Sequence, residues 1–82
     1  MSYFVYMLKS KGTKSVTYVG YTHDLERRIT LHNAGKGAKF TRGRKWKLIY
    51  KEKTRTKNEA ISREYYIKKN RKFRKSIKDK YR

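Results

Sequence analysis

The chain has 82 residues, of which 25 are Lys or Arg and six are Asp or Glu, so its formal net charge is +19. A chain of this length has room for one domain with a small core. Such a charge excess is typical of proteins that bind polyanions, because Lys and Arg side chains release counter-ions from nucleic-acid phosphates. Cysteine is absent, which excludes disulfides and thiolate metal sites.

The sequence contains no segment that points to a membrane. It has no long apolar span, no basic amphipathic helix with a wide apolar face and no lipidation signal. The N-terminal run MSYFVYMLKS is too short and too interrupted for the apolar region of a signal peptide. We therefore expect a single folded domain over residues 1–82, located in the cytoplasm and without a membrane partner.

Three segments have the pattern of β-strands. Residues 3–8 form a compact apolar and aromatic run, and residues 16–21 follow after a polar turn that contains Gly12. The short connection between these two segments predicts a hairpin. Residues 46–52 carry apolar or aromatic side chains at alternate positions, with lysines on the other face, as a half-buried strand does. The residues expected on one face of this third strand are Trp46, Leu48 and Tyr50.

Three further segments have helical character. The first begins near Asp24, which together with Thr22 is a candidate N-cap, and ends at the stop signal in residues 33–35. A capping box at residues 56–59 opens a second helix that runs to about residue 69. Residues 70–82 predict a shorter, basic third helix anchored by Phe73 and Ile77. The order β-β-α-β-α-α predicts an α+β fold, with a three-stranded antiparallel-type sheet flanked by helices.

Tyrosines occupy matching places in the two strands of the predicted hairpin. Tyr6 lies in the first strand and Tyr18 in the second, so pairing of the strands can bring both phenols together at the sheet surface. The alternative is that they are two strand aromatics that only pack on each other. Gly20, two residues beyond Tyr18, marks a bulge or a close approach of the backbone.

The first predicted helix carries Arg28 and His32 on one stripe with apolar residues. A guanidinium there cannot be deeply buried without a partner, and at the rim of the sheet it can offer two donors to a phosphate. The alternative for Arg28 is that its stem covers the core while its head reaches water. The alternative for His32 is a helix cap or a histidine at the edge of the core.

Glu64 is one of few acids in the basic C-terminal half of the chain. It falls among apolar residues on the inner face of the second helix, where a carboxylate needs a cation. One protein carboxylate, with substrate phosphate oxygens and waters, is a common way to hold Mg²⁺. The alternative is a structural ion pair with Arg28 or with a lysine.

Residues 35–45 form a basic loop with glycines, but their spacing is not that of a nucleotide-binding P-loop. The cations of this loop are suited to contact a nucleic-acid backbone, with Phe40 or Trp46 available to stack on a base. The alternative is a plain solvated loop. The expected backbone contacts are Lys36, Lys39, Arg42, Arg44 and Lys45.

Taken in order, these motifs resemble the GIY-YIG nuclease family, in particular its small single-domain members. Residues 4–6 (FVY) and 18–20 (YVG) match the two motifs that name the family. Residues 21–43 resemble its helix and following loop, and residues 60–69 resemble its acidic helix. The resemblance extends over nearly the whole chain. One departure is Phe4, which stands where the first motif has glycine.

The resemblance implies metal-dependent hydrolysis of a DNA phosphodiester. Glu64 would hold the divalent ion, Mg²⁺ or Mn²⁺, and Arg28 would bind the scissile phosphate and stabilise its developing charge. Tyr6 and Tyr18 would orient or activate the attacking water. A free phenol has a pKa near 10 and is a poor base at neutral pH, so a nearby metal and Arg28 would have to lower the phenol pKa.

The same resemblance assigns supporting roles to three further residues. His32 would assist by hydrogen bonding or by proton transfer, and its ordinary pKa makes it the competing base. Gly20 would let the backbone pass close to the site, and Asn33 is carried by the same segment as His32. Larger members add a separate DNA-binding domain, which this chain lacks, so the charge of +19 would have to replace it.

Three functions follow from the sequence. The first is a divalent-metal-dependent endonuclease acting on DNA, with branched or damaged DNA as candidate substrates and no small-molecule cofactor. The second is a basic DNA- or RNA-binding module that keeps the nuclease fold but cleaves nothing. The third is an RNA-directed or ribosome-associated protein. The sequence does not define the oligomeric state.

Overall fold

The computed structural model describes residues 2–12 and 14–80 and contains three strands and three α-helices. The elements are β1 (Tyr3–Ser10), β2 (Thr17–Thr22), α1 (Leu25–Asn33), the 3₁₀ helix η1 (Lys39–Thr41), β3 (Trp46–Thr54), α2 (Lys57–Lys69) and α3 (Arg71–Lys80). This order confirms the predicted β-β-α-β-α-α arrangement. The predicted third helix was extended to residue 82, and its last two residues lie outside the described part of the chain.

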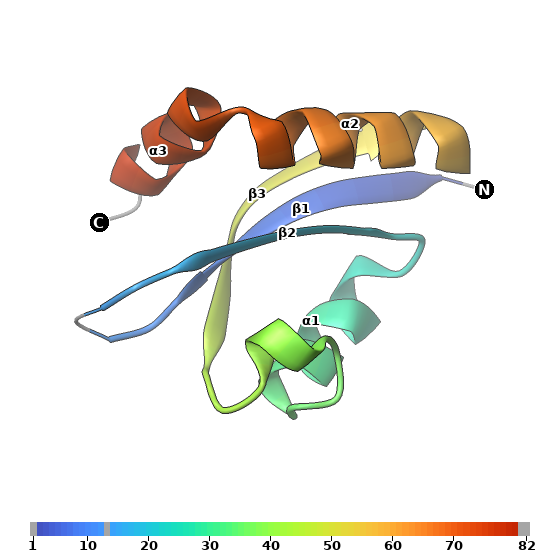
Figure 1. Ribbon diagram of the computed structural model, residues 1–82. Helices are drawn as coiled ribbons and strands as arrows, with labels where there is room; N and C mark the ends of the chain where they lie inside the picture. The colour runs from blue at the N-terminus through green and yellow to red at the C-terminus, as the bar shows by residue number, and fades with distance from the viewer. Residues whose placement is uncertain (1, 13, 81–82) are drawn as a thin grey trace.

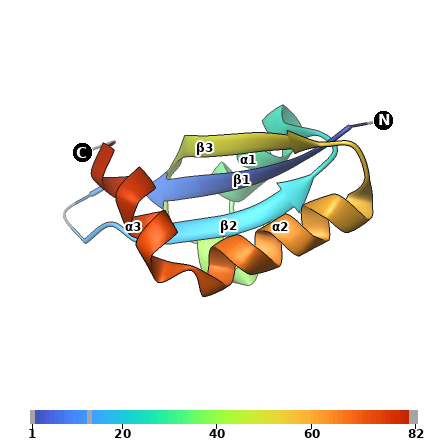
Figure 2. The same cartoon turned by 90° about the horizontal axis from the view of Figure 1, so that it is seen from above.

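The sheet has β1 at its centre, with the strand order β2-β1-β3 and both pairings antiparallel. Two helices, α2 and α3, cover one face, whereas α1 and η1 lie on the other (Figure 1). Seen from above, α2 runs beside the edge strand β2, and α3 crosses near the hairpin end of the sheet (Figure 2). No helix in residues 2–12 and 14–80 is long and apolar enough to span a bilayer.

Capping side chains set where α1 and α2 begin. Asp24 accepts a hydrogen bond from the backbone N–H of Arg27 at 3.1 Å, so Asp24 rather than Thr22 caps α1. At α2, the Thr56 side chain accepts from the backbone N–H of Glu59, also at 3.1 Å, as the predicted capping box requires. Both helices therefore start where local sequence chemistry places them.

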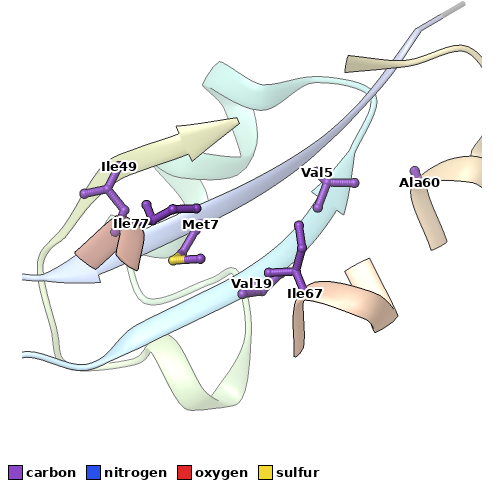
Figure 3. Packing of buried hydrophobic residues seen from close by; sticks show 7 residues of the cluster. All are labelled: Val5, Met7, Val19, Ile49, Ala60, Ile67 and Ile77. Atoms are coloured by element: carbon purple, nitrogen blue, oxygen red, sulfur yellow. The ribbon is translucent and has the colours of Figure 1, made fainter. Parts of the chain in front are cut away.

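The main core lies between the sheet and the pair α2 and α3 (Figure 3). Strand residues on this face alternate, so that Val5, Met7 and Val19 all project toward the helices. Ile67 of α2 and Ile77 of α3 close the cluster from above. This packing fixes both basic helices against one face of the sheet and so determines which of their side chains remain free.

A bulge in β3 changes the face on which its residues lie. Met7 pairs with Tyr50 and Leu8 pairs with Leu48, so Ile49 is one extra residue in β3. Trp46 and Leu48 pack on the α1 side, but Tyr50 packs against the core under α3. The prediction that Tyr50 shares a face with Trp46 was therefore wrong, because one inserted residue inverts strict alternation.

The same inversion brings Glu52 to the α2 side of β3. Arg63 donates two hydrogen bonds to the Glu52 carboxylate, at 2.5 and 3.0 Å, and the Tyr50 hydroxyl donates a third at 2.6 Å. The hydrogen bonds from Arg63 hold the pKa of Glu52 below its ordinary value, against the opposing effect of burial. This bidentate pair ties α2 to β3.

We expect Glu52→Gln to lower stability at neutral pH by about 1 kcal/mol or less, since Arg63 is 40% exposed and solvent screens the pair. Because the folded-state pKa is depressed, the wild-type advantage is complete above the ordinary carboxyl value of 4.5 and disappears as the pH falls below it. Urea unfolding between pH 3 and 7 measures this difference. Asp79→Asn, in an exposed pair with Lys75, is the control. If the difference in unfolding free energy between wild type and Glu52→Gln did not change with pH, the ion pair would not be the source of this stability.

Candidate active site

A pocket of about 420 Å³ lies beside the C-terminal half of β2 and extends around this edge strand. Arg28 of α1 and Glu64 of α2 both line it. These two helices cover opposite faces of the sheet (Figure 1). A site at an open sheet edge is accessible to a long polymeric ligand. Five residues expected from the sequence to form the site line this pocket: Tyr6, Tyr18, Gly20, Arg28 and Glu64.

Gly20 provides the space in which the two tyrosines meet. Tyr6 pairs directly with Gly20 across the hairpin, and the Tyr6 and Tyr18 ring centroids are 6.4 Å apart. A Cβ atom added to Gly20 would lie 2.5 Å from the Tyr6 hydroxyl and 3.2 Å from a ring carbon of Tyr18. Any other residue would therefore displace the phenol that reaches the pocket.

The Tyr6 hydroxyl is anchored by a buried hydrogen-bond chain. It lies 2.9 Å from Nε2 of His32, whose Nδ1 lies 2.9 Å from Oγ1 of Thr41. The Thr41 hydroxyl donates its single proton to the carbonyl oxygen of Ala38 at 2.9 Å, so it can only accept from His32. This assigns the proton to Nδ1 of a neutral His32, and Tyr6 then donates to Nε2.

Burial keeps both groups of this pair neutral at physiological pH. It lowers the pKa of His32, and the positive charge of Arg28 adds to this effect. Burial also raises the pKa of Tyr6, and the charges of Tyr18 and Glu64 raise it further, while Arg28 opposes them. Arg28 thus acts on Tyr6 in the direction expected from the sequence, but burial outweighs it.

His32 itself does not line the pocket. Its side chain is 1% exposed, and it contacts the pocket through the Tyr6 hydroxyl. Gly37 in the following loop makes room for the imidazole, because a Cβ atom there would overlap Nδ1. The arrangement makes His32 a buried group that can exchange a proton with Tyr6 but cannot reach a substrate directly.

Arg28 and Glu64 supply the opposite charges of the pocket. Arg28 is half-buried, and within residues 2–12 and 14–80 no carboxylate forms an ion pair with its guanidinium. Glu64 is 19% exposed and pairs with Lys68, one turn further along α2, at 3.2 Å. The alternative that Glu64 pairs with a lysine is therefore observed, while Arg28 remains available to an anion.

The donor set of the pocket fits a hard divalent ion that completes its coordination with substrate. The described residues contain no group of three or more His, Asp or Glu side chains that could hold a metal unaided. Mg²⁺ commonly binds through one or two carboxylates, with waters and substrate phosphates in its other positions. Glu64 is the carboxylate that lines the pocket, and a metal there must compete with Lys68.

Asn33 lies away from the pocket, at the end of α1. Its side-chain oxygen accepts from the backbone N–H of Trp46 at 2.6 Å, and its amide donates to the Trp46 carbonyl at 3.3 Å. Asn33 therefore fixes the start of β3 relative to α1. The structure gives it a supporting position and no contact with the pocket.

The basic loop also lies outside the pocket. Its five expected phosphate contacts are all exposed, and none forms an ion pair with a carboxylate among the residues described. Trp46 is 3% exposed and donates its indole N–H to the Thr41 carbonyl, so the sequence-based expectation that it could stack on a base was wrong. Phe40 is 58% exposed and stacks on Tyr18 with ring centroids 6.1 Å apart. The five cations are Lys36, Lys39, Arg42, Arg44 and Lys45.

Two basic residues of the pocket were not identified as site residues from the sequence. Lys57 occupies the first position of α2, and His23 follows the last residue of β2. The available signal was positional, because a strand end and a helix start frequently lie side by side. A histidine after a strand and a lysine at the start of a helix are both common, so neither indicates a site without the tertiary structure.

Comparison with known proteins places this geometry in a family. The model of the GIY-YIG catalytic domain matches residues 2–78. The UPF0213 protein CPE1444 of Clostridium perfringens is 55% identical over 67 residues, which cover 80% of this chain and 70% of the relative. The UPF0213 protein YazA of Bacillus subtilis is 46% identical over 69 residues, which cover 83% and 68% of the two chains.

A solved structure supports the same assignment. The solution NMR structure of the UPF0213 protein BH0048 from Bacillus halodurans is 40% identical, with a TM-score of 0.53 over 93% of this chain and 80% of that chain. The three-stranded antiparallel sheet and the element order β-β-α-β-α-α are consistent with these matches. The chain belongs to the GIY-YIG family and is related to its UPF0213 proteins.

Proposed function

We propose that this protein is a cytoplasmic, divalent-metal-dependent endonuclease that hydrolyses phosphodiester bonds in DNA, with branched and damaged DNA as its candidate substrates. The observation that carries the proposal is the meeting of Arg28 and Glu64, from helices on opposite faces of the sheet, in one pocket with Tyr6 and Tyr18. A cation that can stabilise a phosphate, an acid that can hold a metal and two hydroxyls that can orient water are groups suited to phosphodiester hydrolysis. Membership of a nuclease family supports the same chemistry.

In this proposal Arg28 binds the scissile phosphate through its guanidinium donors and stabilises the charge that grows on the phosphate oxygens. Glu64 holds Mg²⁺ or Mn²⁺, which when bound supplies Lewis-acid stabilisation of the same charge. Lys57, at the start of α2, adds a positive charge on the α2 side of the pocket. Tyr18 orients the attacking water by hydrogen bonding beside Tyr6.

The buried chain behind Tyr6 provides a route for the proton of that water. The water transfers a proton to the Tyr6 oxygen while Tyr6 passes its own proton to Nε2 of His32. His32 becomes an imidazolium whose second proton stays on Nδ1, in the hydrogen bond to Oγ1 of Thr41. The hydroxide oxygen bonds to phosphorus, the bond to the leaving oxygen breaks, and that oxygen takes a proton from solvent.

Glu64→Gln removes the negative charge that would hold the metal, so we expect cleavage to fall at least about a hundredfold. The assay uses flap, splayed and four-way junction DNA with Mg²⁺ or Mn²⁺. Glu26→Gln is the matched control, because Glu26 is an exposed acid of α1 outside the pocket. Cleavage that survives Glu64→Gln would eliminate the metal role of this residue.

Tyr6→Phe interrupts the proton route, and we expect a rate loss of about a hundredfold. The route needs neutral His32, so the wild-type rate should be level at neutral pH and decline as the pH falls through the His32 pKa, which lies below 6.5. Tyr6→Phe should lose this pH dependence. Tyr3→Phe, in the same pocket, is the control. An unchanged rate and profile in Tyr6→Phe would transfer the base role to Tyr18.

A second candidate function is nucleic-acid binding without cleavage. It is favoured by Lys68, which already neutralises Glu64, and by the exposed loop cations outside the pocket. Replacing Arg42 and Arg44 by Gln should reduce the slope of log affinity against log salt by about 2 if each contacts a phosphate. The control removes two exposed charges of β3, Lys51 and Lys53.

Cleavage assays on the same ligands separate the two functions. Tight, salt-dependent binding with no cleavage of any DNA or RNA structure in either metal would favour the binding module. Metal-dependent cleavage that Glu64→Gln abolishes would favour the endonuclease. Competition between DNA and RNA ligands ranks the two polymers in either case.

A further inference from the structure

A second hollow, of about 530 Å³, lies between α3 and the segment that leads into β2. Its floor is formed by residues 15–17, which precede and begin the edge strand. Its wall is a face of α3 on which cations recur at the spacing i, i+3, i+4 and i+7. These cations are Arg71, Arg74, Lys75 and Lys78.

Packing of α3 explains why these cations line the hollow. Phe73 and Ile77 are turned into the core under α3, which fixes the rotation of the helix on the sheet. Lys78 is anchored across the hollow, because its ammonium donates to the Ser15 carbonyl oxygen at 3.0 Å. The cationic stripe is therefore a built surface with a defined orientation rather than a frayed basic tail.

The charge of the hollow is not balanced within the described chain. Its single acid, Asp79, pairs with Lys75 at 3.8 Å, and both are exposed. Among the described residues no carboxylate pairs with Arg71 or with Arg74, although Arg74 is half-buried. A partly desolvated guanidinium without a carboxylate is suited to an anionic ligand with several oxygens.

The hollow and the candidate active site lie along the same edge strand. Thr17 lines the hollow, whereas Tyr18, Gly20 and Thr22 line the active-site pocket. At about 3.3 Å per residue, the backbone of β2 extends roughly 10 to 17 Å from Thr17 to Gly20 and Thr22. Each strand of a DNA duplex carries one phosphate per about 3.4 Å of axis, so for a duplex that lies along β2 this separation corresponds to about three to five nucleotides.

We propose that the hollow between α3 and residues 15–17, called the groove from here on, is a second phosphate-binding site. It holds the DNA backbone about three to five nucleotides from the bond that is cut. The position relative to the cut rests on the proposed function, but the binding itself does not. The α3 helix, which forms the wall of the groove, lies on the sheet face opposite α1 and η1 (Figure 1). The contribution of the groove can therefore be separated from that of the basic loop.

The first experiment measures binding alone. Fluorescence anisotropy with a labelled 16-base-pair duplex is recorded from 50 to 300 mM salt in EDTA, so that no cleavage occurs. Arg71→Gln with Arg74→Gln should weaken binding at least about tenfold and reduce the salt slope by about 2. The control, Lys72→Gln with Lys80→Gln, removes the same charge from exposed positions of α3 outside the groove.

A clearly smaller loss in the control supports a defined groove. Equal losses in both double variants would overturn it, because α3 would then act only through its total charge. Circular dichroism and thermal unfolding confirm that both double variants keep the fold. The groove variants remove exposed or half-buried arginine heads and leave Phe73 and Ile77 in place.

The second experiment maps the position on a substrate that is cleaved. Single methylphosphonate linkages, which are uncharged, are introduced one to eight nucleotides on either side of the cut. We expect the wild type to lose affinity when the neutral linkage lies about three to five nucleotides from the cut, and the groove variant to be insensitive there. Two results would overturn the proposed spacing even if the endonuclease function holds. One is that only a neutral linkage at the scissile position weakens binding, and the other is that the groove variant responds to the neutral linkages as the wild type does.

Discussion

The hydrogen bond between Tyr6 and His32 is the contact on which the site depends. It joins the central strand to α1, and through Thr41 it extends to the loop before β3. Both partners are almost fully buried, so loss of either leaves an unsatisfied polar group at a cost of about 1–3 kcal/mol. Gly20 and Gly37 leave the space that the two rings occupy. Two small residues thus define the position of one phenol.

The edge position of β2 places the pocket next to this contact at the surface of the protein. Because β2 pairs only with β1, its outer side is open, and side chains from both sheet faces can approach one point beside Gly20. An open edge is ordinarily a hazard, since it can pair with another chain. Here α2 runs beside it, and a protein with a net charge of +19 repels its own copies. The edge is therefore available to a polyanion.

Local signals were sufficient for the order of elements and for five of the residues that line the pocket. Caps and periodicity located α1 and α2, and strand pairing brought Tyr6 and Tyr18 together. What depended on tertiary structure was not predictable. The bulge that moved Tyr50 to the other face is marked only by three consecutive apolar residues at 48–50, a run that a strand buried on both faces shows as well. The burial of Trp46 depends on the residues that pack around it, and its indole N–H is satisfied there by the Thr41 carbonyl. The same limit applies to Lys57, whose place beside the pocket is set by how α2 crosses the sheet.

The ion pair between Glu64 and Lys68 couples the proposed metal to the proposed substrate. Without nucleic acid, Lys68 neutralises Glu64 and competes with any divalent ion for the carboxylate. A phosphate in the pocket favours the metal ion in this competition in two ways. It offers oxygen ligands to the ion, and it offers Lys68 an anionic partner other than Glu64. If Glu64 holds the metal, then metal and DNA must strengthen each other's binding by the same factor, because such coupling is reciprocal. A carboxylate held by a lysine would then suppress metal loading until the substrate is in place.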